Sequence, residues 1–249
     1  MHLPIAWAGL QQPADIDNVN IQKNVSSVNI GEVRPTMAKP KAPPRSSAER
    51  YHHGDLRRAL VKTALAMVTE EGAWNFTLRE VARRAGVSHA APYNHFADKG
   101  ALLAEVAAVG FRALGREMER ASRRARSARQ GLLGIAIAYV RFGVERPAHY
   151  RLMFGPELAE KERYPLLQQA SDATFGALTS ALQRGQVAGD LRPAPVNDQA
   201  LAAWSLVHGL TTLMIDQRLS FLGVSASEAE RQARSAGAAL LDGLTAPRK

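Results

Sequence analysis

The chain has 249 residues, of which 46% are hydrophobic and 22% charged, a composition typical of a folded protein with a substantial core. It contains no cysteine, which excludes disulfides, thiolate zinc sites and cysteine nucleophiles and agrees with a cytoplasmic location. The formal net charge of +9 favours a polyanionic partner such as nucleic acid, although charge alone does not exclude a basic protein without one.

Residues 1–50 are expected to be disordered, because they lack a helical repeat of apolar residues and become basic and proline-rich from Met37. The first residues do not follow the pattern of a secretion signal, and we expect no membrane span, since no apolar run reaches about eighteen residues. The change of composition suggests that the natural start is Met37. Peptides from residues 1–36 in the native protein, sought by mass spectrometry, would contradict this.

Residues 51–98 predict three helices. Asp55 can cap the first, whose apolar residues repeat at helical spacing until Gly72. Thr77, followed three residues later by Glu80, has the pattern of a capping box at the start of the second helix, which Gly86 ends. Ser88 can cap a short third helix to about His95. A helix, a glycine-containing turn and a second helix are the signature of a helix-turn-helix unit.

Pro92 falls within that third helix. Its missing N–H would have made the first intrahelical bond, to Ser88. It also biases Ala91 away from helical angles. We therefore expect a distorted or partly 3₁₀ first turn and a helix that is otherwise retained.

Residues 99–249 are predicted to be helical throughout, which makes the fold class all-α with about nine helices. Asp98 can cap a helix that begins near Lys99. The remaining helices are expected at about 132–142, 147–154, 164–188, 197–222 and from Ser225 or Ser227 to 244. The helix at 197–222 is apolar nearly all round, so either an oligomer interface or the interior of its own domain buries it.

His89, Tyr93 and His95 could suggest a metal or catalytic site. The two histidines are six residues apart, which misses the i, i+4 spacing of a helical two-histidine site. Neither a completing carboxylate nor a nucleophile with an orienting acid accompanies them. We expect no metal, no cofactor and no enzymatic activity. The YHHGD segment before the first helix is better explained as a solvated leader than as a metal site.

A DNA-facing role explains the same residues better. In a helix-turn-helix unit the second helix lies in the major groove with its N-terminal residues at the base edges. This assigns base reading to His89, Ala90 and Ala91, and phosphate contacts to the polar side chains around them. The predicted DNA-binding residues are Thr77, Ser88, His89, Ala90, Ala91, Tyr93, Asn94, His95 and Lys99.

Trp204 and His208 are four residues apart and share a helix face. Either residue alone is more often part of a core, but together with other large apolar side chains they could line a ligand cavity. The candidate effector pocket consists of Phe111, Tyr139, Phe142, Met153, Phe154, Phe175, Trp204 and His208.

The segment TLREVARRAGVSHAAPYNHFADKGALL, from Thr77 to Leu103, resembles the DNA-binding domain of the TetR family of bacterial transcription regulators. WSLVHGL, with Trp204, His208 and Gly209, and YRLMFGPEL, from Tyr150 to Leu158, resemble a subgroup named for a WHG motif. The chain departs from the family at Pro92, where an aliphatic residue is commoner, and at Gly100. The glycine leaves the start of the fourth helix open.

The resemblance implies three N-terminal helices that bind DNA and a C-terminal domain that binds an effector and dimerises through helices eight and nine. The domains are then 1–50, an extension; 51–98, the helix-turn-helix domain; and 99–249, the effector and dimerisation domain. The expected function is that of a ligand-responsive regulator, most simply a repressor. Its expected partners are a pseudopalindromic double-stranded DNA operator, an apolar or amphipathic small molecule and a second copy of the chain, with no membrane. The rivals are an enzyme on a helical bundle, which turnover would reveal, and a basic protein-binding adaptor, which DNA footprinting would distinguish.

Overall fold

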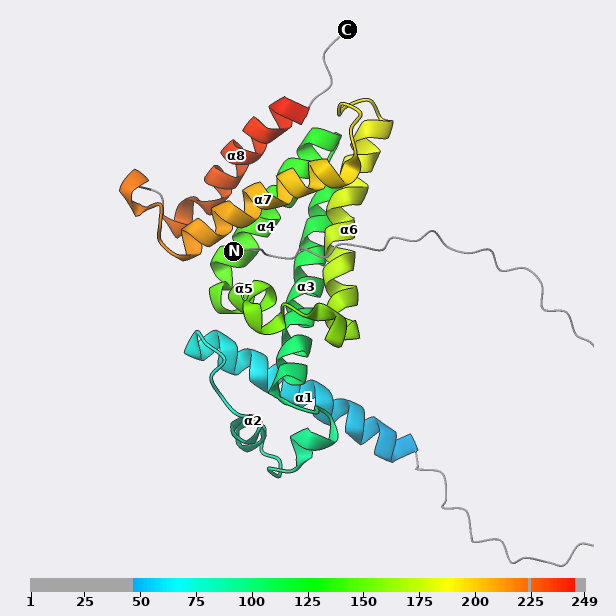
Figure 1. The fold of residues 1–249 in the computed structure, drawn as a ribbon, viewed down its shortest axis with the longest axis vertical. Helices are drawn as coiled ribbons and strands as arrows, with labels where there is room; N and C mark the ends of the chain where they lie inside the picture. The colour runs from blue at the N-terminus through cyan, green and yellow to red at the C-terminus, as the bar shows by residue number, and fades with distance from the viewer. Residues whose placement is uncertain (1–46, 224, 245–249) are drawn as a thin grey trace, which may run out of the picture. The chain divides into compact units, whose positions relative to one another are not determined.

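A computed structural model describes residues 47–223 and 225–244, with side chains from Asp55 onward. Within these residues eight α-helices and five short 3₁₀ helices occur, and no β-strand (Figure 1). The α-helices are α1 Ser47–Glu71, α2 Leu78–Arg84, α3 Lys99–Arg123, α4 Ala128–Glu145, α5 Pro147–Phe154, α6 Pro165–Val187, α7 Val196–Ile215 and α8 Ala229–Leu244. The 3₁₀ helices are η1 Ala91–Asn94, η2 Pro156–Leu158, η3 Lys161–Arg163, η4 Ser220–Leu222 and η5 Ala226–Glu228. The all-α prediction is confirmed, and the eight α-helices with η1 account for the predicted nine.

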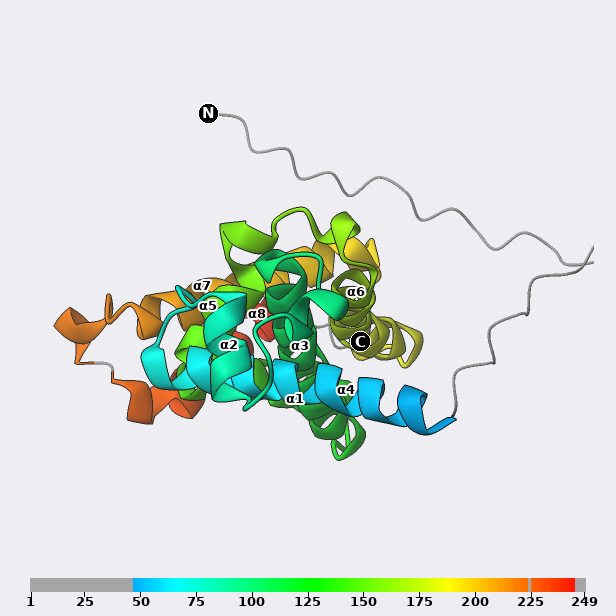
Figure 2. The same cartoon turned by 90° about the horizontal axis from the view of Figure 1, so that it is seen from below.

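The long helix α3 lies at the centre of the described fold. It packs against α4 and α6 along its length, and against α1 and α5 nearer its N-terminal end (Figures 1 and 2). Its buried side chains recur at helical spacing from Leu102 to Met118, so that one face of a single helix serves several neighbours. A continuous cluster of buried apolar residues runs from α1 to α8. Among the described helices none has the length and apolar character of a membrane span.

Two ion pairs hold the N-terminal helices together. Arg57 of α1 pairs with Glu105 of α3, and its Nε lies 2.8 Å from the Glu105 carboxylate. Arg84 of α2 pairs with Glu70 of α1. Both pairs are partly exposed, so each contributes about 0–1 kcal/mol and serves mainly to orient the helices.

Three predicted boundaries require correction. Helix α1 begins at Ser47 rather than at Asp55, since Ala48, Glu49 and Arg50 favour a helix. Residues 47–50, expected to be disordered, are therefore helical, whereas the rest of that prediction and Met37 lie outside the described residues.

At the other end of the chain, α7 stops at Ile215 rather than near Leu222. The turn that follows places Gln217 at a positive φ of 54°, which a helix cannot continue through. Ser225 forms a capping box, as a start near this residue requires, but one turn of 3₁₀ helix precedes α8.

Gly110 allows α5 to approach α3 closely. A Cβ atom at this position would lie 2.7 Å from Nε2 of His149 and would also overlap Met153. The His149 ring is buried, and its Nε2 lies 2.8 Å from the carbonyl oxygen of Val106, one turn before Gly110. The imidazole therefore donates a hydrogen bond to the backbone of α3 in the space that the glycine leaves open.

We expect Gly110→Ala to lower the free energy of unfolding by about 1–3 kcal/mol, because the added methyl group must displace a buried ring from its hydrogen bond. Gly176→Ala in α6 is the matched control. Its Cβ would meet nothing within 4 Å, so the substitution should be neutral or stabilise by up to about 1 kcal/mol. Urea denaturation measures both changes. Equal midpoints for the two variants would contradict the close packing at Gly110.

A second prediction concerns pH. Burial lowers the pKa of His149 below its ordinary value of 6.5; the hydrogen bond to Val106 acts in the opposite sense, and the charge of Arg146 reinforces the lowering. The unfolded chain therefore binds more protons, and stability should fall as the pH drops from about 6.5 toward the lowered value. One such group contributes up to about 1.4 kcal/mol per pH unit. Thermal unfolding of His149→Gln should show a shallower loss between pH 7 and pH 5, and an unchanged slope would contradict this.

Candidate nucleic-acid interface and effector site

Helix α2 is closed at both ends by local hydrogen bonds, as its sequence predicts. The Thr77 hydroxyl accepts from the backbone N–H of Glu80 at 3.2 Å, and the Thr77 N–H donates to the Glu80 carboxylate at 2.6 Å. These bonds from Thr77 lower the pKa of Glu80. The predicted capping box is therefore confirmed.

The turn after α2 is a Schellman motif. Gly86 has a φ of +71°, and its N–H donates to the Arg83 carbonyl at 3.2 Å, while the Val87 N–H donates to the Ala82 carbonyl at 3.0 Å. Glycine adopts this left-handed conformation without the Cβ penalty of other residues. The motif turns the chain sharply away from α2 and leads it directly into the segment Ser88–Ala90.

The third helix differs from its prediction. We expected a helix from Ser88 to His95 with only its first turn distorted, but the segment is a 3₁₀ helix of four residues, Ala91–Asn94, and Ser88 makes no side-chain cap. Pro92 explains the difference, because it removes the N–H that would have bonded to Ser88 in an α-helix. The Tyr93 N–H instead donates to the Ala90 carbonyl at 3.2 Å, and the His95 N–H donates to the Pro92 carbonyl at 2.9 Å. The Pro92 ring itself is buried.

The residues predicted to face DNA lie around α2 and η1, at the opposite end of the helical bundle from α8 (Figure 1). Six of them are exposed: Thr77, Ser88, His89, Ala90, Tyr93 and Asn94, whereas Ala91, His95 and Lys99 are half-buried. Tyr93 is 54% exposed, which is unusual for a large aromatic side chain. The ammonium group of Lys99 lies 5.6 Å from the centre of the Phe76 ring. The six exposed residues can therefore contact a partner from one end of the helical bundle, and the roles of all nine stay predictions.

The sequence did not determine where α3 begins, because Gly100 is a poor helix former, and the structure explains the glycine by the position of Tyr164. The helix begins at Lys99, and the Asp98 carboxylate accepts from the Ala101 N–H at 2.7 Å. A Cβ atom on Gly100 would lie 2.7 Å from the hydroxyl of Tyr164. The absence of a side chain allows Tyr164, just before α6, to pack on the first turn of α3.

Six of the eight predicted effector-pocket residues form one aromatic cluster, which we call the Phe154 cluster. The Phe154 ring centre lies 5.2 Å from that of Phe111 and 4.8 Å from that of His208. The other predicted members are Tyr139, Phe175 and Trp204, and Tyr150 joins them. Phe154, Phe175, Trp204 and His208 are half-buried, so the cluster reaches the protein surface.

Two predicted residues contact other parts of the core. Phe142 is fully buried and packs near His149 and under Arg146, whose guanidinium carbon lies 4.8 Å from the ring centre. Met153 is buried against Gly110. Sequence spacing could not separate these two from the cluster, since all eight are apolar or aromatic residues on helices.

The cluster contains a polar centre at His208. Its Nδ1 lies 2.9 Å from the hydroxyl of Tyr139 and 2.7 Å from that of Tyr150, and the Trp204 indole N–H donates to the Tyr139 hydroxyl at 3.1 Å. Burial lowers the pKa of His208, with a smaller contribution from the charge of Lys161, and burial raises the pKa of Tyr150 to about 12. These groups are therefore uncharged near neutral pH and act as hydrogen-bonding groups.

Lys161, which the sequence analysis did not identify, places a positive charge beside the Phe154 cluster. Its ammonium nitrogen lies 4.7 Å from the centre of the Phe111 ring and 5.9 Å from that of Phe154, and it donates a hydrogen bond to the Ser171 hydroxyl at 3.0 Å. Burial lowers the pKa of Lys161, while Asp172 and Glu162 oppose that change. Lys161 lies in a polar connection between helices, and its sequence neighbours give no sign that it points inward.

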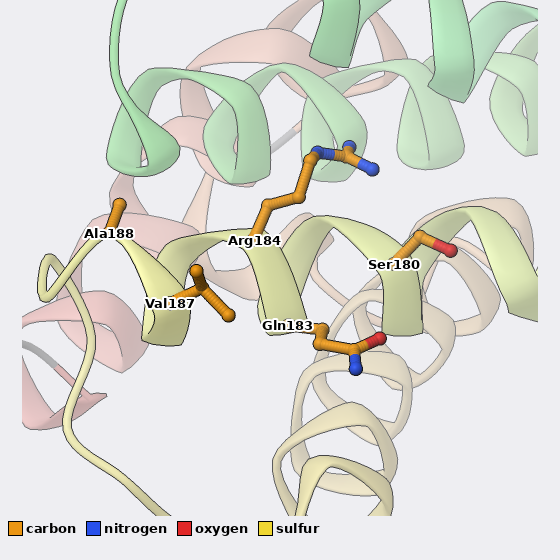
Figure 3. A pocket seen from close by; sticks show the side chains of 5 residues that line it. All are labelled: Ser180, Gln183, Arg184, Val187 and Ala188. Atoms are coloured by element: carbon orange, nitrogen blue, oxygen red, sulfur yellow. The ribbon is translucent and has the colours of Figure 1, made fainter.

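A surface hollow lies elsewhere, on α6 (Figure 3). Its lining contains none of the predicted pocket residues and consists of Ser180, Gln183, Arg184, Val187 and Ala188. Arg184 donates to the hydroxyl of Ser122 at 3.0 Å, which joins this part of α6 to α3. In the part of the chain that the structure describes, no group of three or more His, Asp or Glu side chains could hold a metal ion.

Two family models match the chain. The model of the bacterial regulatory proteins of the tetR family matches residues 60–106, which include α2, η1 and the start of α3. The model of the tetracyclin repressor-like C-terminal domain matches residues 132–240, from α4 to α8. No curated protein matches the chain.

Solved structures agree with these matches. A protein with unknown function from Rhodococcus sp. RHA1 is 32% identical, with a TM-score of 0.67, over 79% of this chain and 98% of that one. A TetR family transcription regulator from Marinobacter aquaeolei VT8 is 19% identical, with a TM-score of 0.59, over 80% of this chain and 100% of that one. The TetR family transcriptional regulator PfmR from Thermus thermophilus is 22% identical, with a TM-score of 0.57, over 75% and 99% of the two chains.

The helix-turn-helix geometry around Gly86, the helical C-terminal part and the two family matches agree, and the chain belongs to the TetR family of DNA-binding transcription regulators.

Proposed function

We propose that the protein is a ligand-responsive repressor that binds a pseudopalindromic operator as a homodimer. The main support for this proposal is the surface formed by the Schellman turn and η1. At this end of the helical bundle the side chains of Ser88, His89, Ala90, Tyr93 and Asn94 are exposed. The net charge of +9 supports a polyanionic partner. A two-fold dimer would place the two recognition elements about one DNA turn apart, roughly 34–36 Å.

Within this surface we assign different roles to different residues. Exposed His89 and Ala90 precede η1, where they can approach base edges, and small alanines allow close contact with a thymine methyl group. The hydroxyl of Tyr93 and the ammonium group of Lys99 are suited to phosphate oxygens, which position a protein without specifying sequence.

The effector site in this proposal is the Phe154 cluster. Its half-buried rings offer apolar surface, and the polar centre at His208 offers hydrogen bonds, so that an amphipathic molecule would be complementary to it. For such a molecule to release DNA, it must bind the DNA-incompetent state more tightly than the DNA-bound state.

Helix α7 supports dimerisation through α7 and α8. Leu201 and Leu213 are 54% and 44% exposed, and Gly209, between them on the same helix, has nothing within 4 Å of its Cβ position. Exposed large apolar side chains beside a glycine suit close packing against a helix of a second copy.

We also propose the finer assignments that accompany this function. Trp204, His208 and Gly209 support membership of the WHG-type subgroup, residues 51–98 are assigned to DNA binding, and residues 99–249 to effector binding and dimerisation. A regulator of this kind acts on chromosomal DNA, so we assign it to the cytoplasm.

His89→Ala should reduce discrimination among operator variants by about 1–3 kcal/mol at the position it reads, because a base contact is lost. Lys99→Ala should weaken binding to all DNA sequences alike. It should also reduce the slope of log affinity against log salt concentration by about one, the loss of one phosphate contact. Gel-shift titrations on the intergenic DNA beside its own gene, at several salt concentrations, measure both effects.

Arg126→Ala is the control for the DNA experiment, since this exposed arginine lies between α3 and α4, away from the proposed interface. It should leave both affinity and specificity unchanged. No retarded band at low salt with a folded wild-type dimer would contradict the proposed function itself.

Gly209→Glu should shift the protein from dimer to monomer, because it places a charge at the centre of the proposed interface. Gly176→Glu in α6 is matched to it, since both glycines are helical and open at the Cβ position. Sedimentation velocity distinguishes the two states. A Gly209→Glu variant that remains as dimeric as Gly176→Glu would place the interface elsewhere.

A further inference from the structure

Lys161 stands out as a half-buried cation beside two aromatic rings. It comes from η3, in the connection between α5 and α6, and it reaches the Phe111 and Phe154 rings and the Ser171 hydroxyl. Asp172 and Glu162 act on its charge from a distance. Among the side chains that the structure describes, from Asp55 to Gly223 and from Ser225 to Leu244, no ion pair joins a carboxylate to its ammonium group within 4.0 Å. Ring faces and one hydroxyl replace only part of the hydration that burial removes.

A bound carboxylate would compensate for this burial directly. The charged atoms would pair inside a site of low dielectric, where a charge-assisted hydrogen bond is stronger than at the surface. A phosphate or sulfate would be less suited, because the immediate surroundings offer one cation and two aromatic rings rather than a set of donors. The site therefore favours a single negative charge.

The rest of the ligand is specified by the neighbouring rings. Phe154 is a neighbour of both Lys161 and His208, and the half-buried Trp204 and Phe175 rings continue the aromatic cluster. A flat aromatic group can pack in offset or edge-to-face geometry against these rings while its carboxylate reaches Lys161. The uncharged His208 and its two tyrosines could add a hydrogen bond to a hydroxyl substituent.

The same connection also contacts the start of α3. Tyr164, three residues after Lys161, packs on Gly100, which follows the first residue of α3 and lies two residues after the Asp98 cap. The connection crosses α3 on its way from α5 to α6 (Figure 1). A ligand that draws Lys161 to a new position therefore acts on a short segment that touches the base of the DNA-binding unit.

We propose that the effector is an aromatic carboxylate, that Lys161 binds its carboxylate beside Phe111 and Phe154, and that Tyr164 transmits the binding to α3 through Gly100. This inference rests on the proposed ligand-responsive function. The binding part of it requires no DNA, and so it fails or succeeds independently of operator recognition.

Isothermal titration of the full chain with benzoate, 2-naphthoate and indole-3-acetate, each beside its uncharged amide, tests the ligand class. At least one acid should bind ten-fold or more tightly than its amide. Lys161→Met should remove that difference, and Lys161→Arg, which keeps the charge, should retain part of it. Lys161→Met should fold normally, since it exchanges a half-buried charge for an apolar side chain of similar length.

Equal binding of acids and amides, unchanged preference in Lys161→Met, or no binding of any acid to the wild type would each overturn the assignment of Lys161. Transmission is tested with Tyr164→Ala, which should bind the acid within about three-fold of the wild type but retain its DNA complex when the acid is added. Release of DNA equal to that of the wild type would overturn the role of Tyr164 and leave the carboxylate site standing.

Discussion

The packing of α3 is the constraint on which the rest of the structure depends. This helix of 25 residues begins at the Asp98 cap, directly after the segment predicted to face DNA, and its buried side chains pack against α4, α5 and α6 along its length. At Gly110 the helix lacks a side chain, and the hydrogen bond from His149 to the Val106 carbonyl uses the space. A group that binds a backbone carbonyl fixes both the position and the direction of its neighbour more strictly than apolar contact does. Helix α5, and the connection that follows it, are thereby held to α3.

Local chemistry explains which parts of the fold could be predicted from the sequence. The capping box at Thr77 and Glu80, the cap at Asp98, and the helix between Pro147 and Phe154 depend on residues within a few positions of one another, and each was predicted within a residue or two. The end of α7 and the length of η1 were not. In the first case the apolar pattern continues beyond Ile215 although the backbone turns, and in the second a proline alters the hydrogen bonding of the whole segment rather than of its first turn.

The candidate effector site shows the other limit of sequence reasoning. Residue type and helical spacing identified Trp204, His208 and Phe154, because large apolar side chains on helices converge in a bundle core. They could not exclude Phe142, which lies instead under Arg146, nor find Lys161, whose position depends on the path of a polar connection across α3. Contacts between residues far apart in the chain are set by tertiary packing, and they cannot be identified from residue type and spacing in a single sequence.

The 3₁₀ geometry of η1 limits how many DNA base pairs this short element could contact in the proposed complex. A 3₁₀ helix rises about 2.0 Å per residue and repeats every three residues, so its four residues extend only about 8 Å, and Ala91 and Asn94 lie on one row. Stacked bases are spaced about 3.4 Å apart along a strand. In the proposed complex η1 would span little more than two base-pair steps, with the proposed base-reading residues His89 and Ala90 directly before it. In that proposed complex, discrimination over a longer operator would draw on the bending and groove width of the DNA, which are energies of deformation rather than contacts.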